Sequence, residues 1–313
     1  MYDIVVLGEY FFDQIFIGMP HFPKLGCETF CQDIISTGGG LYTTVVTLRR
    51  LGVRVGWSAL FGNDYYSRFV YDLAQAEGVD LSLVKHLDRP YRRVTTSLPY
   101  NGERAFVTYV DGEDPAEQRT HWLATMQTHT FRHVHIGGLM PPDELRPLLQ
   151  PARAHGATVS IDCQDVPLLE KPCNCREALT MVDIFMPNAR ELMLVAETDT
   201  VDSALRKLMS LCALIVVKDG ANGCWIGHQG EITHVPGICA GACVDTTGAG
   251  DCFNGGFLYG YVVEHAPLDV CGRYGNICGG LSVTGRGGAT AAPTRDTLLS
   301  WCTTPESVVP AGD

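Results

Sequence analysis

The chain has 313 residues, of which 46% are hydrophobic and 19% charged, and this composition is too apolar for a disordered protein. Lys and Arg together number 23 against 35 Asp and Glu, which gives a formal net charge of −12. A surface this acidic repels nucleic-acid phosphates and anionic lipids, so we expect neither as a partner.

Short apolar runs alternate with helical patterns along most of the chain. The first run, DIVVL, ends at Gly8 and is typical of a strand buried on both faces. The alternation predicts an α/β fold, a mostly parallel central sheet with helices on both faces. The predicted strands are residues 3–7, 53–60, 133–136, 158–162, 184–186 and 214–218, and the predicted helices are residues 45–51, 143–154 and 190–196.

Two stretches interrupt this alternation, one near residues 11–35 and one a hairpin over residues 94–110 with Asn101-Gly102 at its turn. They predict a small antiparallel sheet outside the main one. Neither is long enough to hold its own core. We therefore expect one domain over residues 1–313, with insertions at about 11–36 and 92–111 that form a lid over a ligand crevice.

The 13 cysteines are scattered, and the segment MYDIVVLGEYFFD lacks the basic, apolar and cleavage regions of a signal peptide. We expect reduced thiols in a cytoplasmic protein. Cys173 and Cys175 have no second pair at zinc-finger spacing, so no structural metal is expected. The sequence contains no uninterrupted apolar run of ~18 residues, which argues against a membrane span.

The most informative segment is DTTGAGD at residues 245–251, which opens directly into a helical pattern. Gly248 and Gly250 allow backbone N–H groups to point into open space at the positive end of the helix dipole, where an anion would bind. Asp251 lies in the first helical turn. It could cap the helix, or act as a general base beside the anion site, and spacing alone leaves both open.

This segment resembles the C-terminal signature of ribokinase-like, PfkB-type carbohydrate kinases. The similarity covers nearly the whole chain and implies the ribokinase-like fold, with a small antiparallel lid sheet. The other matching segments are GEYFFD (8–13), TGGGLYTTVVTLRRLG (37–52), NGERAFVTY (101–109), NARE (188–191) and KDGANG (218–223).

The resemblance implies transfer of the ATP γ-phosphoryl group to a hydroxyl of a small sugar or sugar acid, with Mg²⁺ and a monovalent cation such as K⁺. Asp251 would be the base and Gly248, Ala249 and Gly250 the anion hole. The implied substrate contacts are Asp13, Gly38, Gly39 and the position of Thr43. The implied nucleotide and magnesium contacts are Asn188, Glu191, Lys218, Gly220, Gly223, Gly250 and Asn276, and the implied monovalent-cation ligands are Asp245, Thr247, Ser282, Gly285 and Gly287.

Three positions depart from the family pattern. Thr43 stands where the family usually has Asn, whose amide both donates and accepts hydrogen bonds. The segment IGGLMPP (136–142) lacks the acidic sugar ligand of ribokinases proper, which makes ribose less expected. Lys218 stands where the family often has Thr, and it could either meet a phosphate or extend along the surface as an ordinary lysine.

Other side chains have a structural interpretation beside the functional one. Asp13 could be a solvated carboxylate at a strand end, whereas His133 and His135 are interpreted as packed histidines because no third metal ligand stands nearby. The arginines near the hairpin could bind a substrate phosphate or pair with Glu103 or Asp111. These arginines are Arg92, Arg93 and Arg104.

Alternative functions remain open at this point. A nucleoside kinase or a phosphosugar kinase of the same family is one, the latter using Lys24 and the hairpin arginines to bind a phosphate. A sugar sensor without turnover is another. A dinucleotide oxidoreductase is excluded by the missing GxGxxG fingerprint. The apolar residues Phe11, Phe12, Ile15 and Phe16 exceed what a thin surface sheet exposes, which predicts a homodimer through the lid.

Overall fold

The computed structural model describes residues 1–101, 103–112, 115–164 and 172–303. In this part of the chain the main sheet has eight strands in the order β14-β13-β12-β11-β10-β9-β1-β4. All neighbours are parallel except where β13 meets β12 and β14, so the predicted mostly parallel sheet is confirmed. The strands are β1 (Tyr2–Leu7), β4 (Val55–Ser58), β9 (Phe131–Ile136), β10 (Thr158–Asp162), β11 (Ile184–Met186), β12 (Leu214–Lys218), β13 (Gly223–His228) and β14 (Glu231–Pro236).

Helices cover both faces of this sheet because successive strand residues point to opposite sides. In β1, Ile4 and Val6 belong to one buried cluster and Val5 and Leu7 to the other. The first cluster includes residues of α1 (Leu41–Arg50), α2 (Tyr65–Ala76), α8 (Ala249–Leu258), α9 (Leu268–Ser282) and α10 (Arg295–Thr303). The second includes residues of α3 (Pro115–Thr128), α4 (Pro142–Ala154), α5 (Pro172–Leu179), α6 (Ala189–Ala196) and α7 (Val201–Leu208).

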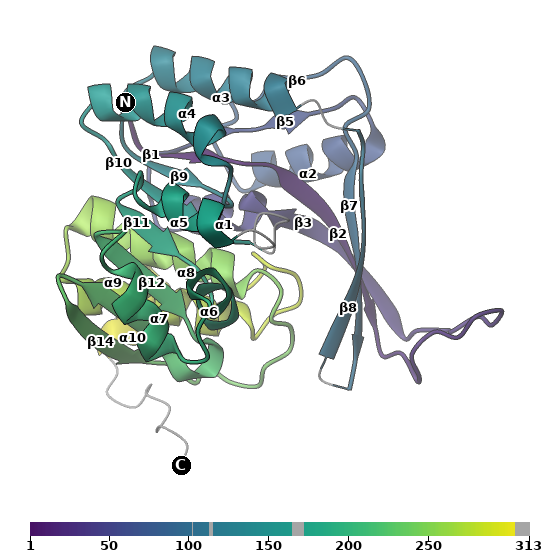
Figure 1. Ribbon diagram of the computed structural model, residues 1–313. Helices are drawn as coiled ribbons and strands as arrows, with labels where there is room; N and C mark the ends of the chain where they lie inside the picture. The colour runs from purple at the N-terminus through teal and green to yellow at the C-terminus, as the bar shows by residue number, and fades with distance from the viewer. Residues whose placement is uncertain (102, 113–114, 165–171, 304–313) are drawn as a thin grey trace.

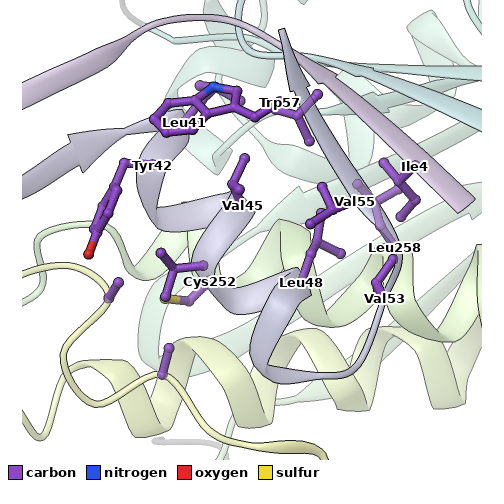
Figure 2. Packing of buried hydrophobic residues seen from close by; sticks show 14 of the residues in the cluster. Ile4, Leu41, Tyr42, Val45, Leu48, Val53, Val55, Trp57, Cys252 and Leu258 are labelled. Atoms are coloured by element: carbon purple, nitrogen blue, oxygen red, sulfur yellow. The ribbon is translucent and has the colours of Figure 1, made fainter. Parts of the chain in front are cut away.

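Helix α1 packs against both α8 and β4, and Figure 2 shows its Val45 and Leu48 near Val55 of β4 and Cys252 of α8. Its Val45 and Leu48 are fully buried in the same cluster as Trp57 of β4 and Cys252 of α8. The helix starts directly after Gly40, whose φ of 60° favours glycine and where a Cβ would lie 2.9 Å from the Glu9 carbonyl oxygen. This packing places the N-terminus of α8 beside that of α1.

A second sheet extends from the side of the main body (Figure 1). Its strand order is β3-β2-β7-β8, and we call it the small sheet. Both hairpins, β2–β3 and β7–β8, are antiparallel, and β2 meets β7 in parallel. The strands are β2 (Tyr10–Ile17), β3 (Asp33–Gly40), β7 (Arg93–Tyr100) and β8 (Glu103–Val110), and a separate two-stranded pair is β5 (Leu60–Phe61) with β6 (Lys85–His86).

The apolar residues on the small sheet differ from the expected ones. Phe12 and Ile15 are each 3% exposed, so the prediction that they need an outside partner is wrong. The Phe12 ring instead packs edge-on against Tyr66 and Phe69 of α2. Phe11 and Phe16 are half-buried. The exposed large apolar residues on or beside this sheet are Phe22, Leu25, Phe30, Ile34, Phe106, Val107 and Tyr109.

The histidines of β9 are packed, as expected. The rings of His133 and His135 are fully buried and both hydrogen-bond the Ser160 hydroxyl, while His133 also contacts the Thr158 hydroxyl. Among the described residues, no group of three or more His, Cys, Asp or Glu side chains is arranged to hold a metal ion. None of the helices in this part of the chain is long and apolar enough to cross a membrane.

Candidate active site

The carboxyl ends of neighbouring parallel strands bring polar side chains together, as is usual for ligand sites in open α/β sheets. Asp162 ends β10, Lys218 ends β12, and Asn188 follows β11 between them. The N-terminus of α8 approaches the same edge, since a Cβ on Gly250 would lie 3.6 Å from Lys218 Nζ. The strand ends and this helix terminus define the candidate site.

The turn before α8 has the geometry of an anion-binding loop. Gly248 has a φ of 70°, and a Cβ there would lie 2.8 Å from the Gly288 Cα, so only glycine fits. The first amides of a helix have no helical carbonyl one turn earlier to bond, so those of Gly248 and Gly250 are available for an anion. The Ala249 amide between them donates a 3.3 Å hydrogen bond back to the Thr246 carbonyl. We call residues 248–250 the anion loop.

Asp251 follows this loop in the first turn of α8, and its carboxylate accepts a 3.3 Å hydrogen bond from the Thr44 hydroxyl of α1. Burial, reinforced by the negative charges of Asp162 and Asp13, raises the pKa of Asp251 to about 7. The positive charge of Lys218 and the Thr44 hydrogen bond act in the opposite direction. A carboxyl group with a pKa near neutrality is suited to accept a proton during a reaction.

Asp13 lies in the middle of β2, opposite Thr37 of β3, and is only 8% exposed. A Cβ on Gly39 would lie 2.0 Å from its Oδ2 atom, so the space that this carboxylate occupies exists because residue 39 is glycine. Burial, together with the charge of Asp245, raises the pKa of Asp13 to about 7. Gly38 plays a similar steric part, because a Cβ there would meet the Tyr42 ring at 2.5 Å.

Thr43 is wedged beneath the anion loop. It is 1% exposed, and a Cβ on Gly288 or Gly248 would lie 2.7 or 3.3 Å from its hydroxyl oxygen. Within the described residues this hydroxyl has no hydrogen-bond partner. Gly248 and Gly288 lie against the Thr43 side chain. This packing does not test the expected role of Thr43 in substrate binding, which stays a prediction.

The small sheet contacts the candidate site through Arg104 of β8. Its guanidinium donates a 2.9 Å hydrogen bond to the Thr247 hydroxyl and lies 3.8 Å from an Asp245 carboxylate oxygen. Arg92 pairs with Asp111 at 2.8 Å, as one of the two interpretations held. Arg93 lies over the Phe11 and Tyr91 rings, at 4.9 and 5.5 Å from their centroids.

Asn188 and Glu191 form a capping box at the start of α6. The Asn188 side chain accepts a 2.9 Å hydrogen bond from the Glu191 amide, and Glu191 Oε2 accepts one of 2.8 Å from the Asn188 amide. This pattern accounts for both residues as helix-capping groups. Their expected contacts with nucleotide and magnesium stay predictions.

Lys218 is not an extended surface lysine, because its amine is held by a carboxylate, and its expected contact with a nucleotide phosphate stays a prediction. Its side chain is 12% exposed, and Nζ donates to Asp162 Oδ1 at 2.9 Å and to Oδ2 at 2.8 Å. The reason is that β10 and β12 end together on either side of β11. Asp162 was not singled out from the sequence, although its place at the end of a predicted strand could have identified it.

The remaining nucleotide positions have structural roles of their own. The Asn276 amide of α9 donates to the Val235 and Pro236 carbonyls at 3.0 and 2.9 Å and thereby holds β14. A Cβ on Gly223 would lie 2.2 Å from the Val235 carbonyl oxygen. Gly220 has a φ of 55° and starts the 3₁₀ turn Gly220–Asn222. Their contacts with a nucleotide are not tested by this geometry.

Two loops that carry the expected monovalent-cation ligands lie side by side. The Asp245 carboxylate accepts hydrogen bonds from the Thr247 amide and the Gly287 amide, each at 2.9 Å. The Val244 and Asp245 amides both donate to the Val283 carbonyl. Ser282 ends α9 and Gly285 lies in the second loop that follows it, where the Gly285 amide donates to the Ser282 carbonyl.

Comparison with known proteins agrees with this arrangement. Residues 31–295 match the profile described as pfkB family carbohydrate kinase. The chain is 24% identical over 306 residues to the ribokinase of Haemophilus influenzae, covering 95% of this chain and 97% of the relative. It is 26% identical over 301 residues to a nucleoside kinase of Methanothermobacter thermautotrophicus, covering 93% and 92% of the two chains. A putative ribokinase II from E. coli, solved with ATP and Mg²⁺, superposes with a TM-score of 0.79 at 21% identity and covers 96% of this chain and 99% of its own.

Proposed function

Because the chain belongs to the pfkB family of carbohydrate kinases, which are phosphotransferases with an alcohol group as acceptor, we propose that it transfers the γ-phosphoryl group of ATP to a hydroxyl of a small sugar or sugar acid. One observation carries this proposal. Asp251, with a pKa near 7, directly follows the anion loop at the N-terminus of α8. A proton acceptor and a set of backbone donors are therefore adjacent, as phosphoryl transfer requires.

In the proposed reaction Asp251 accepts the proton of the substrate hydroxyl as that oxygen forms a bond to the γ-phosphorus. The bond from the γ-phosphorus to the bridging oxygen breaks at the same centre, and ADP leaves with that electron pair. The amides of residues 248–250 stabilise the negative charge on the transferred group. Asp13, with room provided by Gly38 and Gly39, would hold other hydroxyls of the acceptor.

Magnesium fits the donors at the strand ends, since carboxylate and amide oxygens are ligands that Mg²⁺ accepts directly or through water. Asn188 and Glu191 would act through magnesium-bound water, and the ion would neutralise the charge of the ATP phosphates. A structural neighbour from E. coli was solved in complex with ATP and Mg²⁺, which supports the use of both by this chain but does not bear on these residues. The loops with Asp245, Thr247, Ser282, Gly285 and Gly287 would hold a monovalent cation, mostly through backbone carbonyls.

The contacts of the arginines on or beside the small sheet favour an acceptor without a phosphate group. A phosphosugar would need two or more convergent cationic groups. Arg92 is already paired with Asp111, and Arg104 is engaged with Thr247 and Asp245. Lys24 is exposed in the loop between β2 and β3. These contacts favour an acceptor that carries no phosphate group.

We also propose that the small sheet acts as a lid and that two copies of the chain pair through it. Phe106, Val107 and Tyr109 of β8 are each more than half exposed, at 54%, 64% and 53%. Exposed apolar side chains gathered on one element favour burial against a partner. Sedimentation velocity measures this state, and a monomer at micromolar concentration would contradict the pairing.

The function is tested by ADP release from ATP across pentoses, hexoses, ketoses, sugar acids, nucleosides and phosphosugars. Parallel reactions omit Mg²⁺ or replace K⁺ by a bulky organic cation. We expect turnover with a sugar or sugar acid that requires Mg²⁺ and increases with K⁺. Turnover only with nucleosides or only with phosphosugars would make the chain a nucleoside kinase or a phosphosugar kinase of the same family. Sugar binding in calorimetry without any turnover would establish a non-catalytic sensor instead.

Replacement of Asn188 by Ala separates its capping role from its proposed role near the phosphates. Thr200→Ala is the matched control, because Thr200 caps α7 by accepting a 3.2 Å hydrogen bond from the Ser203 amide. Both variants should lose about 1 kcal/mol of unfolding free energy in urea titrations. Only Asn188→Ala should also lower kcat/KM for ATP, by roughly tenfold. Equal kinetics in the two variants would leave Asn188 with the capping role alone.

A further inference from the structure

Three buried polar side chains form a closed hydrogen-bonded set behind the anion loop. They are Asp162 of β10, Lys218 of β12 and Asn254 of α8, and we call them the buried triad. Asp162 is 7% exposed and Asn254 fully buried. Asn254 Nδ2 donates to Asp162 Oδ2 at 2.6 Å, and Lys218 Nζ contacts both carboxylate oxygens and Asn254 Oδ1, the last at 3.3 Å.

The triad leaves Lys218 little capacity to bind a ligand directly. An ammonium group has three N–H donors, and three acceptor atoms already lie within 3.3 Å of Nζ. Burial by itself disfavours the charged amine, but attraction by Asp162, Glu191 and Asp251 outweighs it and keeps the pKa of Lys218 above its ordinary value. Lys218 is therefore a fixed positive charge, and it acts on its surroundings through its field.

This charge lies beside the proposed reacting groups. Lys218 Nζ is 3.6 Å from the position of a Cβ on Gly250, and Asn254 follows Asp251 by about one turn of α8. The charged groups that act on Asp251 are Asp162, Lys218 and Asp13, from β10, β12 and β2, together with the Thr44 hydroxyl from α1. His135 of β9 faces Asp162 and Lys218, and burial lowers its pKa to about 4, so the ring is neutral at pH 7.

We propose that Lys218 is a positioning residue for phosphoryl transfer, held by Asp162 and Asn254 so that its charge favours the ionised form of Asp251, which can accept a proton. This inference rests on the proposed function. A carboxylate buried beside Asp162 and Asp13 would otherwise hold its proton at neutral pH. Asp162 and Asn254 also hold the amine in place. A mobile lysine could instead pair with the Asp251 carboxylate and prevent it from accepting a proton.

Opposite changes of charge in the triad test this idea. Lys218→Met removes the positive charge and should move the acidic limb of the pH profile of kcat/KM upward by about one pH unit, as a nearby charge does in a partly buried site. Asp162→Asn removes a negative charge and should move the limb downward. The acidic limb of the double variant Asp162→Asn/Lys218→Met should lie between the limbs of the two single variants. Lys207→Met, the same replacement on the distant helix α7, should leave the limb where it is.

The double variant also guards against misfolding, because Lys218→Met alone leaves Asp162 buried without its cation. If Lys218→Met does not fold, Asp162→Asn carries the test, and a downward movement of its acidic limb supports the proposal. The same limb position in all folded variants, with altered stability alone, would make the triad purely structural and overturn it.

A second measurement is independent of the reaction. NMR titration with ¹³Cγ-labelled aspartate, assigned with Asp251→Asn, reports the pKa of Asp251 directly in each variant. An upward shift in Lys218→Met and a downward shift in Asp162→Asn support the coupling even if no acceptor is ever phosphorylated, in which case the proposed function fails and the coupling stands. An unchanged Asp251 titration overturns the inference whether or not the protein is an active kinase.

Discussion

Replacement of Asp251 by Asn should lower kcat for the acceptor by roughly 10²–10⁴-fold, because the amide cannot accept the hydroxyl proton and general-base catalysis contributes about that much. The KM for ATP should change little, since the anion-loop amides of residues 248–250 remain. Steady-state ADP release, with the acceptor found in the panel, measures both constants. In the wild type, kcat/KM should fall as the pH drops below about 7, where Asp251 gains its proton.

Stability provides the control for this variant. The folded-state pKa of Asp251 is raised from 3.8 to about 7, so its contribution to stability is fully present below pH 3.8 and is lost as the pH rises through 7. Asn cannot ionise, and Asp251→Asn should therefore have a Tm at pH 8 equal to or above that of wild type. Asp269→Asn makes the same change in the first turn of α9 and should keep full activity. A variant at position 251 that is folded and fully active would exclude the general-base role.

The layered fold could be predicted from the sequence because buried parallel strands are apolar throughout and are separated by helical patterns. The predicted strand at residues 158–162 and that at 214–218 coincide with β10 and β12. The two antiparallel strands β13 and β14 were not predicted, because Gly227 and the charged or polar residues of β14 interrupt the apolar pattern. Burial on the small sheet was also misjudged, since α2 covers Phe12 from far along the chain.

The candidate site was predictable only where one segment carries its chemistry. DTTGAGD places the anion loop and Asp251 together within seven residues, so local spacing was sufficient to identify them. The buried triad joins residues from β10, β12 and α8, and no pattern of spacing relates Asp162 to Lys218. Lys218 illustrates the consequence, because its environment depends on the strand order rather than on its neighbours in the sequence.

Replacement of Asp13 by Ala should lower kcat/KM for the acceptor by roughly 10²–10³-fold, because hydrogen bonds to a charged group contribute about 1.5–3 kcal/mol each and a carboxylate can accept from two hydroxyls. The effect should be mostly in KM, since Asp13 would bind the acceptor in the ground state as well as in the transition state. The KM for ATP should stay close to that of wild type. Initial rates at varied acceptor and fixed saturating ATP separate these constants.

Asp33→Ala is the matched control, because Asp33 starts β3 of the same small sheet but is exposed and lies 3.6 Å from Arg286. It should bind the acceptor as wild type does. Burial raises the pKa of Asp13 to about 7, so acceptor binding should also weaken as the pH falls below 7, and Asp13→Ala should lose this dependence. Calorimetric titration with the acceptor alone at pH 6 and pH 8 measures it. If Asp13→Ala binds the acceptor with wild-type affinity at both values, the hydroxyl-binding role must belong to another residue, and the buried carboxylate next to Gly39 would require a different explanation.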